Sequence, residues 1–151
     1  MKKLQFKINI EASKEKVWDT MLEDATYREW TSVFSPGSYY KGDWSAGSKI
    51  LFLGPDPRTG EEGGMVSMVS ENKPYEFISL KHIGFVQNGI EDTESEMAKT
   101  WADSSFENYT FNEKDGKTEL VIDLNVTDEL AGEFERMWPD ALKKLKEISE
   151  R

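Results

Sequence analysis

The stretch LQFKINIEASKEKVWDTMLEDATYREW, residues 4–30, decides the fold because its hydrophobic period changes within a few residues. In residues 4–10 apolar and polar side chains alternate, which predicts a half-buried β-strand. After Ser13 the apolar residues recur three and four positions apart, which predicts an amphipathic helix with Ser13 as its N-cap. The side chains expected on its buried face are Val17, Trp18, Met21 and Leu22.

A second, shorter helix is expected directly after the first, with Asp24 as a candidate N-cap. Tyr27 and Trp30 are three residues apart and Phe34 follows four residues later, so a helix places all three along one side. Large aromatic side chains at this spacing either fill an ordinary core or line a space that holds another molecule.

The middle of the chain predicts further strands near residues 38–41 and 49–53, and a hairpin that turns at residues 72–74. Thr93 and Glu96 match a capping box, which predicts a short helix from Thr93 to about Trp101. Met97 and Trp101 are expected to turn inward from this helix. The helix is either a lid across the mouth of a binding cavity or a surface helix whose Trp101 covers the edge of the sheet. Strands over 105–111 and 118–126 are joined by Asp115-Gly116, a strong hairpin signal.

The chain ends in a long amphipathic helix for which Asp128 is the candidate N-cap. Its predicted apolar face should pack on one face of the preceding strand, which carries Leu120, Ile122, Leu124 and Val126. The resulting order of elements predicts an α+β fold, with an antiparallel sheet of about six strands bracketed by helices. A length of 151 residues favours one domain over residues 1–151.

Composition excludes several classes of function. The formal net charge is −10, which disfavours nucleic acid and anionic membrane surfaces as partners. The absence of cysteine removes thiolate chemistry and fits a reducing compartment. The first residues lack a signal-peptide pattern, and no apolar run is long enough to span a bilayer. The sequence therefore predicts a cytoplasmic protein without membrane insertion.

His82 is the single histidine of the chain, and this limits the chemistry. A serine triad would need His82 as its base, and the sequence contains no G-x-S-x-G elbow. A histidine metal site would have one imidazole, so neither a metal nor another cofactor is expected. His82 follows Leu80 by two residues, so both are expected on the same strand face, where the imidazole could reach a bound ligand. The alternative is a histidine satisfied locally or exposed to solvent.

The segments IEASKEKVWDTMLEDATYREW, GDWSAGSKILF and WPDALKKLKEISE together resemble the START-like or SRPBCC superfamily along the whole chain. More narrowly, the chain resembles the small bacterial proteins of the family named for the activator of the heat-shock-protein-90 ATPase. This resemblance implies a helix-grip fold, in which a curved antiparallel sheet wraps around the C-terminal helix and leaves a cavity. It also implies a contact with a chaperone, because of the activity for which the family is named.

With that fold, side chains from many elements are expected to line the cavity, and Trp30 and Phe34 to face its mouth. The predicted ligand-binding residues are Trp30, Phe34, Trp44, Phe52, Met68, Leu80, His82, Trp101 and Trp138. The leading interpretation is a binding protein for a small hydrophobic molecule that is lipid-like, polyketide-like or aromatic. The alternatives are a cyclase or hydrolase that uses the same cavity, and a module that interacts with a chaperone.

Overall fold

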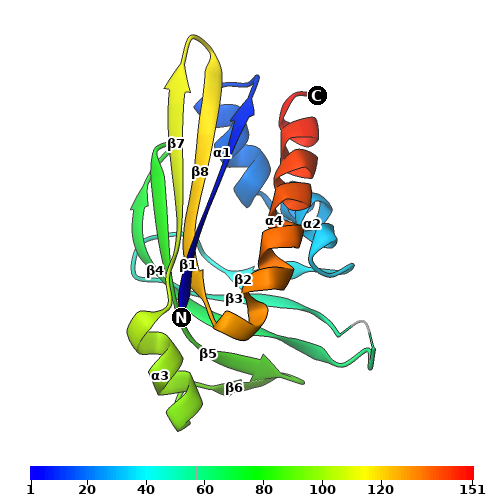
Figure 1. Cartoon of the computed structure of the whole chain (residues 1–151), viewed down its shortest axis with the longest axis vertical. Helices are drawn as coiled ribbons and strands as arrows, with labels where there is room; N and C mark the ends of the chain where they lie inside the picture. The colour runs from blue at the N-terminus through cyan, green and yellow to red at the C-terminus, as the bar shows by residue number, and fades with distance from the viewer. Residues whose placement is uncertain (57) are drawn as a thin grey trace.

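The computed structural model describes residues 1–56 and 58–151 (Figure 1). Its elements, in chain order, are β1 (Lys2–Ile10), α1 (Lys14–Leu22), α2 (Asp24–Trp30), the 3-10 turn η1 (Thr31–Val33), β2 (Tyr39–Gly42), β3 (Lys49–Pro55), β4 (Glu62–Lys73), β5 (Phe77–Gln87), β6 (Ile90–Asp92), α3 (Glu96–Ser104), β7 (Glu107–Lys114), β8 (Lys117–Val126) and α4 (Asp128–Ser149).

The strands form one curved antiparallel sheet in the order β1-β8-β7-β5-β4-β3-β2, and β6 pairs separately with β5. The sheet is open because β1 and β2 lie at its two ends. The predicted α+β helix-grip class is confirmed, with eight strands in the described part of the chain instead of about six.

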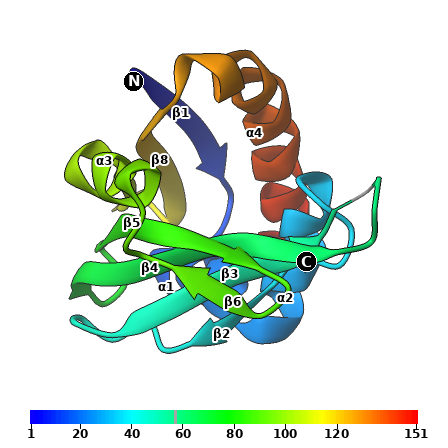
Figure 2. The same ribbon diagram turned by 90° about the horizontal axis from the view of Figure 1, so that it is seen from below.

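The long helix α4 packs against β1 and also contacts α1 and α2, so three helices cover one face of the sheet. Its buried face carries Trp138, Ala141, Leu142, Leu145 and Ile148. These side chains share a core with the inward residues of β8, as the sequence predicts. Figure 2 shows α3 on the left and α4 on the right, with β8 and β1 between them in this view.

The helix caps agree only partly with the prediction. Ser13 caps α1, since its hydroxyl accepts a hydrogen bond from the backbone N–H of Lys16. Asp24 is not a cap: it is the first residue of α2, where its carboxylate accepts a hydrogen bond of 3.1 Å from Arg28. Asp128 is likewise the first residue of α4, and Thr127 occupies the N-cap position. An acidic residue in the first turn also stabilises a helix, through the helix dipole. The sequence alone therefore does not show whether an aspartate is the N-cap or the first residue of the helix.

The predicted capping box at Thr93 is wrong. Helix α3 begins at Glu96, and the Ser95 hydroxyl accepts a hydrogen bond from the N–H of Ala98. Asp92 accepts hydrogen bonds from the N–H groups of the two residues before the helix, so a turn precedes the cap. This turn moves the start of the helix beyond Thr93.

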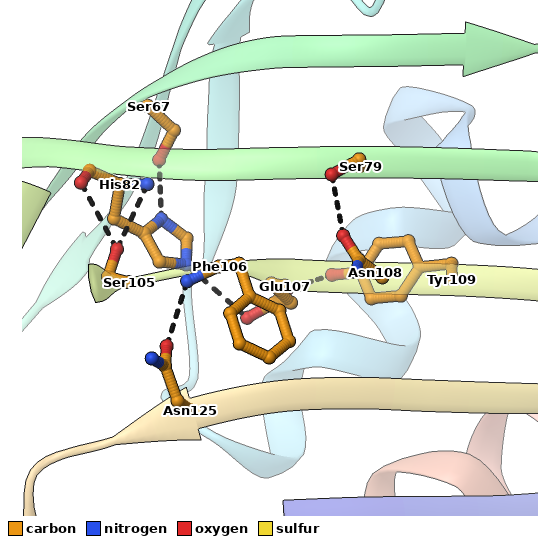
Figure 3. A network of polar contacts seen from close by, with 9 residues as sticks. All are labelled: Ser67, Ser79, His82, Ser105, Phe106, Glu107, Asn108, Tyr109 and Asn125. Carbon is orange, nitrogen blue, oxygen red and sulfur yellow. Dashed lines mark hydrogen bonds and ion pairs between the residues drawn. The ribbon is translucent and has the colours of Figure 1, made fainter. Parts of the chain in front are cut away.

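The sheet divides beside α3. β7 pairs with β5 only between Phe77 and Leu80, while it pairs with β8 along its whole length. Beyond this point the Ser105 hydroxyl replaces a strand partner, because it accepts from the N–H of His82 and donates to its carbonyl, both at 3.1 Å (Figure 3). The division leaves His82 at an inner edge of the sheet.

Candidate functional site

A cavity of about 970 Å³ lies between the concave face of the sheet and the helices. Its walls come from α2, η1, β3, β4, β5, α3, β7, β8 and α4. The larger side chains that line it are Tyr27, Trp30, Phe34, Phe52, Met65, Phe85, Trp101, Tyr109, Leu124, Phe134 and Trp138. Met1, Met97 and Leu130 also line it and are at least 45% exposed, so they mark its rim.

The aromatic wall is held in place by contacts among its own rings. Phe34 meets Trp138 edge-on with ring centroids 5.0 Å apart, and Trp30 lies 6.1 Å from Trp138. The Trp30 indole N–H donates a hydrogen bond of 3.1 Å to the carbonyl of Met21, which fixes the ring to the end of α1. Rings restrained in this way resist collapse into the cavity.

A polar group of three side chains lies on the sheet side of the cavity (Figure 3). His82 Nε2 is 3.6 Å from Glu107 Oε1, and the Tyr109 hydroxyl donates a hydrogen bond to Glu107 Oε2. His82 and Tyr109 are both buried, and the Glu107 side chain is 14% exposed. Strands β5 and β7 bring these residues together, since Glu107 is placed opposite Leu80 in their register.

Ser67 on β4 contacts the His82 imidazole at Nδ1, the nitrogen opposite the one that faces Glu107. Its hydroxyl lies 2.7 Å from His82 Nδ1, and the residue is fully buried. The Glu107 carboxylate can only accept, so a proton on Nε2 suits this contact, and Nδ1 shares a hydrogen bond with the Ser67 hydroxyl. The arrangement directs the Nε2–H toward the carboxylate and the cavity.

Two buried phenols beside Glu107 stay protonated. Burial, followed by the negative charge of Glu107, raises the pKa of both Tyr27 and Tyr109 well above the ordinary tyrosine value. Both residues line the cavity. At neutral pH they are therefore hydrogen-bond donors and add no negative charge.

Trp101 connects α3 to this group. Its ring stacks on His82 with centroids 5.2 Å apart and on Phe85 at 4.5 Å. A strictly alternating strand would place residues 82 and 85 on opposite faces. A register shift between β4 and β5, where Ser67 pairs with His82 but Val66 with Gly84, brings both under the indole.

Six of the nine residues predicted to bind ligand line the cavity: Trp30, Phe34, Phe52, His82, Trp101 and Trp138. The described lining does not include Trp44, Met68 or Leu80. Trp44 packs against Tyr40 and Phe52, and Leu80 is fully buried in the core. Met68 lies between the inward residues Ser67 and Val69, so alternation turns it to the opposite face of the sheet.

The predicted inward turn of Met97 is wrong, because its side chain is 68% exposed at the rim. The buried residue of α3 is Ala98, one position later. Sequence reasoning also missed Glu107 and Tyr109. The alternation in ENYTF places Glu107, Tyr109 and Phe111 on one face of the strand. Because Phe111 is apolar, this face could have been assigned to the interior, and Glu107 and Tyr109 with it.

The described residues contain no group of three or more histidine, aspartate or glutamate side chains that could hold a metal ion. Within the same residues, no helix has the length and apolar character needed to cross a membrane.

Fold and cavity together define a START-like protein with helix-grip architecture. The model of the family described as "Activator of Hsp90 ATPase homolog 1-like protein" matches residues 11–150. The chain belongs to this family, as the sequence resemblance implies. No curated protein matches the chain.

Solved structures share the fold at low sequence identity. Protein NE0264 from Nitrosomonas europaea has a TM-score of 0.73 at 16% identity, over 97% of this chain and 92% of that one. The Aha1 dimer from Colwellia psychrerythraea has a TM-score of 0.70 at 18% identity, over 99% and 97%. DynU16, a putative protein in the dynemicin biosynthetic locus, has a TM-score of 0.66 at 13% identity, over 96% of this chain and 46% of its own length.

Proposed function

We propose that the protein binds a small hydrophobic molecule, lipid-like, polyketide-like or aromatic, in the cavity between the sheet and α4. The observation that carries this proposal is an aromatic-walled space of about 970 Å³ with one buried polar group on its sheet side. Ligand sites have volumes of about 300–1,000 Å³, with apolar walls and a few placed polar groups. Ordinary cores contain few voids larger than a water molecule.

The polar group gives the ligand an orientation. A ligand that buries its apolar body against Trp30, Phe34 and Trp138 can present an oxygen or nitrogen to His82 and Glu107. The relationship to DynU16 supports a ligand of biosynthetic origin, since that protein is encoded in a biosynthetic locus. At 13% identity the similarity to DynU16 concerns the fold alone. The chemical nature of the proposed ligand is therefore argued from the residues that line the cavity.

The test is a thermal-shift screen of a metabolite library, combined with mass spectrometry of small molecules that purify with the protein. The proposal predicts that apolar compounds with one polar group raise the melting temperature and are recovered unchanged. Binding to a chaperone, with no response to any compound and no bound molecule, would contradict it and favour an interaction module.

A matched pair of substitutions ties binding to the cavity. Phe134 and Phe77 are both half-buried, but only Phe134 belongs to the described lining. Phe134→Ala should weaken the binding of a hit from the screen by roughly tenfold, the loss expected for one aromatic contact. Phe77→Ala removes the same atoms elsewhere and should leave the affinity unchanged. Equal effects of both substitutions would place the ligand outside the cavity.

A proton-transfer enzyme is the second candidate, and the 3.6 Å approach of His82 and Glu107 at the cavity wall favours it. An imidazole beside a carboxylate can accept and return a proton during a cyclisation or hydrolysis. Conversion of a hit compound that is lost in His82→Gln, with binding retained, would establish this reaction. Binding without conversion would leave the protein a carrier.

A further inference from the structure

The Asp, Glu, Lys and Arg side chains in the described lining of the cavity are all acidic. Asp56, Glu96 and Glu107 line the space, and no lysine or arginine does so in the part of the chain that the structure describes. The α-ammonium of Met1 lies at the rim, where it is 3.9 Å from the Asp128 carboxylate.

Glu107 differs from the other two because its side chain is the least exposed, at 14%. Its Oε2 accepts the Tyr109 hydroxyl, but its Oε1 has His82 Nε2 at 3.6 Å, which is longer than a hydrogen bond. A carboxylate removed from water is costly unless a charged partner or several hydrogen bonds compensate for it. The Tyr109 hydroxyl is the donor hydrogen-bonded to it, so Oε1 keeps capacity for a further donor.

Aromatic side chains line the same cavity as this carboxylate. Tyr27 and Tyr109 line the cavity near Glu107, and Trp101 stacks over His82. Aromatic rings attract cations through their π-faces, most strongly where water is excluded. A carboxylate and several rings around one space are the combination that recognises an ammonium group.

We infer that the cavity selects cationic apolar ligands, with the ammonium of an amine seated between Glu107 Oε1 and the surrounding rings. This inference rests on the proposed function and adds the charge of the ligand to it. Carboxylic acids such as free fatty acids are disfavoured, because their charge would face Glu107, and the described lining contains no lysine or arginine to balance it. The net charge of −10 also draws cations toward the protein.

Three probes with one ring system test the selection. We would measure the affinities of 1-naphthylmethylamine, 1-naphthylmethanol and 1-naphthoic acid by isothermal titration calorimetry. The amine should bind at least about tenfold more tightly than the alcohol, and the acid more weakly than either. Equal affinities for the three, or preference for the acid, would overturn the inference and leave the binding function standing. Failure of all three to bind would count against the binding function itself, and so against both proposals.

Substitution assigns the selection to one carboxylate. Glu107→Gln should reduce the affinity for the amine by about tenfold or more and change that for the alcohol less than about threefold. Glu96→Gln is the control, since it removes the same charge from an exposed position at the rim. If the Glu96 variant loses as much amine affinity as the Glu107 variant, the ammonium site is not at Glu107. The probe comparison on the native protein does not depend on how either variant folds.

Discussion

At the scale of single residues, Ser67 determines how His82 presents its ring. The serine is fully buried, and its hydroxyl satisfies the imidazole nitrogen that faces away from the cavity. Ser67→Ala would leave this buried nitrogen without a partner, so the free energy of unfolding should fall by about 1–3 kcal/mol. Urea unfolding measures the change.

Ser79→Ala is the matched control for that substitution. Ser79 also bonds to a side chain, that of Asn108 at 2.6 Å, but it is only half-buried. Water can replace its partner, and the free energy of unfolding should change by less than for Ser67→Ala. If the two variants are equally stable, the hydroxyl of Ser67 does not support the imidazole.

The buried phenols predict an alkaline loss of stability. A raised pKa in the folded state means that the folded protein holds its proton at a pH where the unfolded chain releases it. The stabilisation from Tyr27 is therefore complete below the unfolded pKa of about 10. Above that pH the free energy of unfolding falls by about 1.4 kcal/mol per pH unit for each such phenol.

Tyr27→Phe removes one of these phenols, so its free energy of unfolding should fall less steeply between pH 9 and pH 11 than that of the native protein. Tyr75→Phe is the control, because Tyr75 is 39% exposed. Chemical unfolding at the two pH values gives both slopes. A Tyr27 variant with the native slope would show that this phenol ionises in the folded protein as it does in water.

At the scale of elements, α3 is the segment whose role is most open to test. It is joined to β5 through Trp101 and Ser105 and begins at the Ser95 cap. Ser95→Ala should cost the helix about 0.5–2 kcal/mol and accelerate amide exchange over residues 96–104. Ser104→Ala, at the exposed last position of the helix, should leave exchange unchanged.

The same exchange measurement tests whether α3 is a lid over the cavity. A lid should gain protection when 1-naphthylmethylamine binds, and it should lose that protection in the Ser95 variant. Exchange in α3 that is the same with and without bound amine would make the helix a fixed cover of the sheet edge.

Local patterns predicted the elements but not their exact junctions. The alternation of residues 4–10 and the helical spacing after Ser13 were sufficient for β1 and α1, because neighbours in sequence decide both periods. The register shifts between β4 and β5 were not visible, since an irregularity depends on the pairing of two strands. This is why the joint position of His82 and Phe85 under Trp101 was not predicted.

Gly84 shows how such a junction is built. A Cβ atom at this position would lie 2.2 Å from the carbonyl oxygen of Asp92, so β6 can approach β5 only because the residue is glycine. The sequence shows a glycine within an apolar strand, which indicates a bulge or a close backbone approach. The sequence does not show that Asp92 is the residue that approaches; the three-dimensional structure does.

At the scale of the whole molecule, the sheet, α4 and the aromatic residues of α2 enclose a space larger than side chains fill. The sequence predicted the class of fold and much of the aromatic wall. The polar side of the cavity was only half predicted, through His82. Alternation puts Glu107 and Tyr109 on one strand face, but it does not show that this strand pairs with β5 beside His82. Long-range pairing of this kind leaves little trace in local periodicity.

The five tryptophans allow one direct measurement of whether this space holds the ligand. Trp30, Trp101 and Trp138 line the cavity, whereas Trp18 packs against Tyr75 and Phe111 outside the described lining. In a ¹H–¹⁵N NMR titration with 1-naphthylmethylamine or a hit from the screen, the indole signals of the three lining tryptophans should shift together while that of Trp18 stays in place. Saturable binding that moves Trp18, or none of the three, would contradict a ligand site between the sheet and α4.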